Sequence, residues 1–154
     1  MGDPMPLCCP ITADLSVLRE RVRRFAAAAG FSGSRLQDVV LAVNEAADNI
    51  VEHGGGGGTL LAYSYDGGIW VELIDPAGTL TAERFADHAA VQPSIAAPGY
   101  GSWIIAQLCD DVVIDQHDGG WRMRLRTSLH PPRSTAQPTQ QTSCWVQRSS
   151  MAEG

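Results

Sequence analysis

Residues 36–53 read LQDVVLAVNEAADNIVEH, and this stretch decides the fold. At about 100° per residue, its apolar side chains fall on one narrow arc of a helix and its acidic and amide side chains fall on the opposite arc. The apolar arc consists of Leu36, Val40, Val43, Ala47 and Ile50. The polar arc consists of Asp38, Glu45, Asp48, Asn49 and Glu52. The pattern predicts one long amphipathic helix whose apolar stripe faces a core.

The polar arc holds the first candidate site. Glu45 and Asn49 are one helical turn apart, so their side chains lean over the same patch. An asparagine offers a neutral oxygen to a hard cation, and a glutamate can polarise a water or a hydroxyl group. The alternative is a solvated helix face with no chemistry.

The segment before this helix predicts a second helix. Asp14 can cap a helix that runs to about residue 29, and Gly30 can end it in the left-handed conformation. Ser34 then caps the central helix, and Gln37 completes a capping box. The core positions of the first helix are Leu15, Leu18, Val22, Phe25 and Ala26. Its flanks carry Arg19, Arg21, Arg23 and Arg24, which form either a solvated face or a surface for an acidic partner.

The rest of the chain alternates apolar runs with turn residues. Strands are expected at 59–65, 69–74, 112–116 and 121–127, and short helices at 81–88 and 102–110. Residues 89–98 read as a loop. We therefore predict an α+β fold, a two-layer sandwich with one mostly antiparallel sheet and helices on one face. Residues 1–13 form an arm or edge strand, residues 14–128 the domain, and residues 129–154 a disordered tail rich in Pro, Gln, Ser and Thr.

Composition narrows the class of protein. The chain has 154 residues, 44% of them hydrophobic, and a net charge of −6, which fits one globular domain and no nucleic-acid surface. No run of about 18 apolar residues suggests a membrane span. The four cysteines form no CxxC pair, and the first residues lack the pattern of a secretory signal. We expect a reducing, cytoplasmic setting.

Two further segments can join the polar helix face at one site. Asp75 ends a predicted strand, and its carboxylate could accept a hydrogen bond or simply start a turn. Gly99 and Gly101 precede a predicted helix, whose free amides and partial positive charge favour an anion. Neither Asp75 nor the two glycines are strong evidence by themselves. The order of the polar helix face, Asp75 and the glycines along the chain is more specific than any one of them.

These segments together resemble a known family. The order E-A-A-D-N-I-V-E-H, then I-D-P-A-G, then P-G-Y-G-S-W-I-I-A-Q-L-C-D-D-V looks like the GHKL (Bergerat-fold) ATPases. Within them it is most similar to the short bacterial anti-sigma-factor serine kinases, the switch-protein kinase type. The resemblance covers residues 14–127 and implies the Bergerat ATP-binding fold, with ATP and Mg²⁺ as ligands.

The resemblance also assigns roles to residues. Asn49 would hold Mg²⁺, and Glu45 would be the general base that activates a serine hydroxyl. Asp75 would accept a hydrogen bond from the adenine amine, and residues 79–98 would form a lid. The remaining nucleotide-binding positions would be Gly78, Gly99, Gly101 and Ser102.

Two positions depart from the family pattern, and they keep alternatives open. Ala77 stands where the first glycine of the D-x-G-x-G box is expected, and Ser102 replaces the usual leucine. The resemblance implies a serine/threonine kinase that acts on a STAS-type antagonist and sequesters a sigma factor. The alternatives are a GHKL-fold anti-sigma binding module with weak or no kinase activity, and a domain of unrelated role. A homodimer is expected from the resemblance alone, without direct contact to nucleic acid or membrane.

Overall fold

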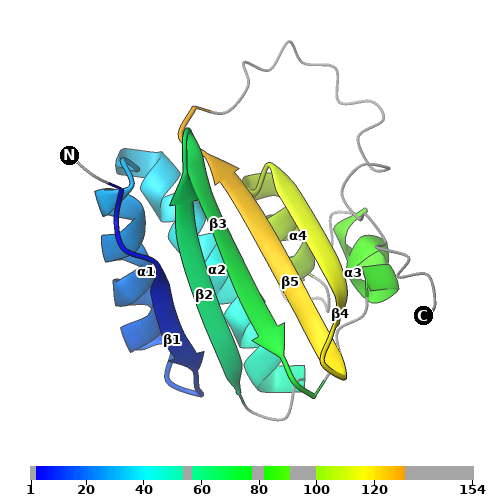
Figure 1. The fold of residues 1–154 in the computed structure, drawn as a ribbon. Coiled ribbons are helices and arrows are strands. Elements are labelled where there is room, and N and C mark those ends of the chain that lie inside the picture. Colours follow the sequence, from blue (N-terminus) through cyan, green and yellow to red (C-terminus); the bar gives the residue numbers. More distant parts are fainter. Residues whose placement is uncertain (1–2, 54–56, 78–81, 91–99, 131–154) are drawn as a thin grey trace, which may run out of the picture.

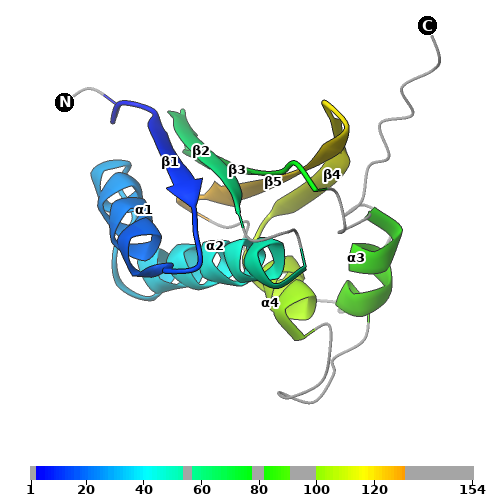
Figure 2. The same ribbon diagram turned by 90° about the horizontal axis from the view of Figure 1, so that it is seen from below.

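The chain folds into two layers, a sheet and a layer of helices on one of its faces (Figures 1 and 2). The computed structural model describes residues 3–53, 57–77, 82–90 and 100–130. The elements are β1 (Leu7–Ile11), α1 (Ser16–Ala28), α2 (Gly33–His53), β2 (Gly58–Tyr65), β3 (Gly68–Asp75), α3 (Ala82–Ala89), α4 (Tyr100–Leu108), β4 (Asp111–His117) and β5 (Gly120–Ser128). The strands pair antiparallel in the order β1-β2-β3-β5-β4. The predicted α+β sandwich is confirmed.

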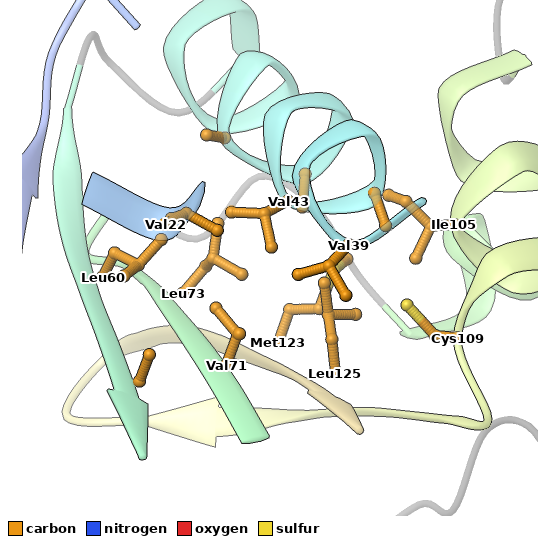
Figure 3. Packing of buried hydrophobic residues seen from close by; sticks show 14 of the residues in the cluster. Val22, Val39, Val43, Leu60, Val71, Leu73, Ile105, Cys109, Met123 and Leu125 are labelled. Carbon is orange, nitrogen blue, oxygen red and sulfur yellow. The ribbon is translucent and has the colours of Figure 1, made fainter. Parts of the chain in front are cut away.

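The predicted apolar stripe of α2 forms the centre of the core. Val40, Val43, Ala47 and Ile50 are buried, and Leu36 packs against the core from its edge. Figure 3 shows Val39 and Val43 pointing toward side chains of β3 and β5, among them Leu73 and Met123. Because α2 is fixed along its whole apolar face, its polar face is held in one orientation relative to the sheet.

An arginine anchors the beginning of α2 to the far end of the sheet. Arg35 donates from Nε and Nη2 to the Ser128 carbonyl oxygen at 3.0 and 2.9 Å, and from Nη2 to Asp110 Oδ2 at 3.0 Å. The Ser128 amide also donates to Asp110 Oδ2, at 2.6 Å. These part-buried, charge-assisted bonds fix the position of the helix that carries the candidate site.

The end of α1 follows the prediction. Gly30 has a φ of 109°, its amide donates to the Ala27 carbonyl at 3.1 Å, and the Phe31 amide donates to the Ala26 carbonyl at 3.0 Å. This is the hydrogen-bond pattern of a Schellman motif, which a glycine permits because it has no Cβ.

The two predicted N-terminal caps have different outcomes. α1 begins at Ser16 with Leu15 in the cap position, and Asp14 Oδ1 accepts from the amide and hydroxyl of Ser16 at 3.0 and 2.6 Å. α2 begins at Gly33, whose φ of 56° turns the chain early, so Ser34 already lies in the first helical turn. Asp14 thus satisfies a free amide of the first turn, as a capping carboxylate does, although the helix begins one residue later than a cap at Asp14 implies. The prediction for Ser34 is wrong.

The fourth helix is shifted from its expected range. α4 begins at Tyr100 and ends at Leu108, whereas 102–110 was the expected span. It stops because the Asp110 amide donates to the Arg126 carbonyl at 2.8 Å, which already belongs to the sheet. The predicted loop at 89–98 and the tail at 129–154 lie almost wholly outside the described residues. Among the helices the structure describes, none is long and apolar enough to cross a membrane.

Candidate functional site

The polar face of α2 meets the first turn of α4. Glu45 and Asn49 are both half-buried, so the reading of a fully solvated face does not hold for them. A methyl group added to Gly101 would come within 2.7 Å of Glu45 Oε2. The carboxylate therefore lies against the backbone at the start of α4, where amides without helical partners give a partial positive charge.

The electrostatic surroundings of Glu45 favour its protonated form. Burial raises the pKa of the Glu45 carboxyl, and the nearby charges of Asp48 and Glu52 raise it further. No arginine among the described residues forms an ion pair with it. A carboxylate with a raised pKa holds a proton more strongly, which suits a general base.

Asp75 lies at the end of β3 and is only 3% exposed. Its Oδ1 accepts a hydrogen bond from the Ala77 amide at 3.0 Å, which fixes the orientation of the carboxylate. Ala77 itself is exposed and does not line the pocket beside Asp75. The methyl group that departs from the family pattern therefore forms no part of the described pocket wall.

A narrow apolar pocket opens beside Asp75, between α2 and the inner face of the sheet. Its walls are Ala46, Ile50, Leu73, Asp75, Ile114, Trp121 and Met123. Asp75 is the one charged side chain among them, so the pocket combines apolar walls with one strong hydrogen-bond acceptor. That combination suits a flat heterocycle that carries an amino group.

The pocket and the polar pair share the same turns of α2. Ala46 and Ile50 line the pocket and directly follow Glu45 and Asn49 in the chain, so the polar pair lies on the arc of the helix next to the pocket wall. A ligand with an apolar ring and an anionic tail could contact both. The structure thus brings Glu45, Asn49, Asp75 and Gly101 to one end of the sandwich.

The other predicted site residues have different outcomes. Ser102 is 3% exposed, inside the first turn of α4. Gly78 and Gly99 lie outside the described residues. Sequence reasoning missed Trp121 and Met123. The alternation along the last predicted strand puts both on one face of the sheet, but their place beside Asp75 depends on the pairing of β3 with β5.

The described side chains of the site could supply few ligands to a metal ion, so an ion bound here would be held mainly by phosphate groups and water. Within the described parts of the chain, no group of three His, Cys, Asp or Glu side chains could hold an ion. Asn49 could supply one neutral oxygen, and Mg²⁺ commonly takes its other ligands from phosphates and water.

Comparison with known families identifies the type of domain. A family model described as the histidine kinase-like ATPase domain matches residues 11–127, which include every described residue of the site. No curated protein matches the chain.

Proposed function

Because the chain belongs to the histidine kinase-like ATPase family of the GHKL superfamily, we propose that it is a Mg-ATP-dependent serine kinase. Its substrate would be a STAS-type antagonist protein, and it would also sequester a sigma factor. The observation that best supports the kinase is the position of Glu45, half-buried against the start of α4 and one turn from Asn49.

Different residues of the site would bind the base, the phosphates and the metal ion of Mg-ATP. The apolar pocket would take the adenine ring, and Asp75 would accept a hydrogen bond from the exocyclic amine. The phosphates would lie toward the first turn of α4, where Gly101 lets the backbone come close. Asn49 would hold Mg²⁺, which neutralises phosphate charge.

Glu45 would act on the acceptor hydroxyl. The serine proton passes to the Glu45 carboxylate while the serine oxygen forms a bond to the γ-phosphorus. The bond from that phosphorus to the oxygen it shares with the β-phosphate breaks, and ADP leaves. Phosphoryl transfer depends mainly on positioning and charge neutralisation, so this short set of residues is sufficient.

A binding module with weak or no kinase activity is the second candidate. The observation that favours it is the Ala77 amide, which already occupies one oxygen of Asp75. Such a module would bind its partner equally well with and without ATP. Its docking surface would be the arginine-bearing face of α1 or an edge of the sheet, where β1 and β4 are the outermost described strands. Arg23 and Arg24 pair with Glu20, and Arg19 donates to Asn44.

The test is phosphoryl transfer from ATP to a purified STAS-type protein, followed by mass spectrometry of the acceptor serine. Glu45→Ala should lower the transfer rate by about 10²- to 10⁴-fold while ATP binding persists. Asp38→Asn, on the same helix but two turns away, is the matched control and should transfer normally. Unchanged transfer in Glu45→Ala would contradict the general-base role. Tight partner binding without any transfer by the wild type would favour the binding module.

A further inference from the structure

Trp121 is more exposed than the other residues that line the pocket. Six of the seven lining residues are buried, with exposed fractions between 0% and 5%, whereas Trp121 is half-buried. Trp121 also packs against the core cluster, so its indole bridges the interior and the solvent. It is therefore the lining side chain with the most freedom to move.

The backbone beneath Trp121 is fixed. Trp121 is the register partner of Asp75, and the two residues lie side by side on β5 and β3. The preceding Gly120 packs so closely that a Cβ there would collide with the Asp75 carbonyl oxygen and lie 2.8 Å from Pro76 Cα. The antiparallel ladder between β3 and β5 extends to this pair and holds the backbone of Trp121 beside Asp75, so we expect the pocket to open through its side chains.

The pocket as it stands is too small for a base. Its free space is about 10 Å³, roughly enough for one water molecule. An aromatic ring can enter only if a lining side chain rotates outward. The buried side chains are held by close packing on several sides, which leaves the half-buried indole of Trp121.

We propose that Trp121 is the gate of the nucleotide pocket and the platform on which the adenine base stacks. The indole rotates outward as the base enters and then covers one face of it, while Asp75 accepts a hydrogen bond at the edge of the base. Indole has the largest π surface of any side chain, and stacking a base on an aromatic ring is strongly favourable. The inference deepens the proposed function, since it requires an ATP site here.

Calorimetry with Mg-ATP tests the stacking role. Trp121→Ala should weaken ATP binding by about 10- to 100-fold, and Trp121→Phe should restore most of the affinity because it keeps an aromatic face. Trp70→Ala is the matched control: it removes the same side chain from β3 at a position whose register partner is Arg126 rather than a pocket residue. It should leave ATP affinity unchanged. Equal affinity in Trp121→Ala and wild type would overturn the proposal.

Fluorescence gives a second readout that does not depend on how well Trp121→Ala folds. A variant with Trp70, Trp103 and Trp145 replaced by Phe keeps Trp121 as its sole tryptophan. Saturating ATP should shift or quench its emission, whereas the same concentration of inorganic tripolyphosphate should not. Emission unaltered by bound ATP would overturn the gate while leaving the ATP site intact. Failure of the wild type to bind ATP would overturn the proposed function itself.

Discussion

Two carboxylates, Asp115 on the outer face of the sheet and Glu45 on α2, lie in opposite surroundings. Asp115 accepts from Arg122 Nε and Nη2 at 3.0 and 2.8 Å and from Arg124 Nη2 at 3.3 Å. Burial raises the pKa of Asp115, but these arginines outweigh it and hold the pKa below its usual value. For Glu45, burial and the neighbouring charges of Asp48 and Glu52 act in the same direction and raise the pKa.

The difference separates a carboxylate that builds the fold from one suited to chemistry. The charge of Asp115 is compensated, so the group stabilises the pairing of β4 and β5. The charge of Glu45 is not compensated by any described cation, so it costs folding free energy and retains affinity for a proton. Uncompensated titratable groups of this kind occur preferentially at functional sites.

Removal of the compensated carboxylate should have the largest effect on stability. Asp115→Asn leaves the guanidinium groups of Arg122 and Arg124 without their anion, and we expect the free energy of unfolding to fall by about 2–3 kcal/mol. Urea unfolding measures this. The control is Asp118→Asn, whose side chain is 93% exposed and which should change little. A loss as small as that of the control would show that the network contributes nothing.

The next largest effect should fall on activity and not on stability. In Gly101→Ala the new methyl group comes too close to Glu45 Oε2, at 2.7 Å, and makes ordinary contacts with the rest of that side chain. Because this oxygen is at the end of a flexible side chain, the carboxylate moves and the backbone need not. We expect unchanged or slightly higher stability, because alanine favours a helix, and phosphoryl transfer about tenfold slower. Parallel unfolding and transfer assays measure both. Lower stability together with a normal rate of phosphoryl transfer in Gly101→Ala would contradict this prediction, because it would mean that Gly101 serves the fold and not the chemistry.

The proton affinity of Glu45 should set the acid side of the pH–rate profile. A base works only when unprotonated, so the rate should fall as pH decreases through the raised pKa of Glu45, at a pH above the ordinary value of 4.5. Asp48→Asn removes a like charge and lowers that pKa. We expect the acid limb to move to lower pH and the rate on it to rise about threefold. If the acid limb of the pH–rate profile does not move in Asp48→Asn, a titratable group other than Glu45 controls it.

The smallest expected effect is a gain in stability. A raised pKa means that the folded protein binds the proton of Glu45 more tightly than the unfolded chain does. The associated stability is present below about pH 4.5 and is lost as pH rises through the folded pKa. Glu45→Gln should therefore raise the free energy of unfolding by about 0.5 kcal/mol at pH 7 and not at pH 4. A decrease at pH 7 would show that the carboxylate stabilises the fold.

Local patterns were enough to predict most of the fold. The apolar stripe of α2, the glycine that ends α1 and the turn between β2 and β3 are all encoded by neighbouring residues, and each was predicted. The helix starts were predicted less well: Asp14 accepts from an amide of the first turn of α1, whereas Ser34 lies inside the first turn of α2 and not at its cap. The position at which α2 begins is set by Gly33, whose left-handed backbone turns the chain one residue before the predicted cap at Ser34.

The site depends on contacts between distant segments, and these were only partly predictable. Glu45, Asn49, Asp75 and Gly101 were named from spacing and family resemblance. The approach of Gly101 to Glu45 requires α4 to pack on α2, and the pairing of Trp121 with Asp75 requires β5 to lie beside β3. Strand order and helix packing are tertiary properties, which no short stretch of the sequence specifies.

The most direct test is calorimetric titration of ATP, with and without Mg²⁺, on the wild type and on Asn49→Ala. The account predicts binding that Mg²⁺ strengthens in the wild type and that Asn49→Ala weakens strongly, because the Asn49 carboxamide would hold the metal and the metal would neutralise phosphate charge. Absence of binding by the wild type at millimolar ATP, or equal Mg²⁺ dependence in the variant, would contradict a nucleotide site on α2.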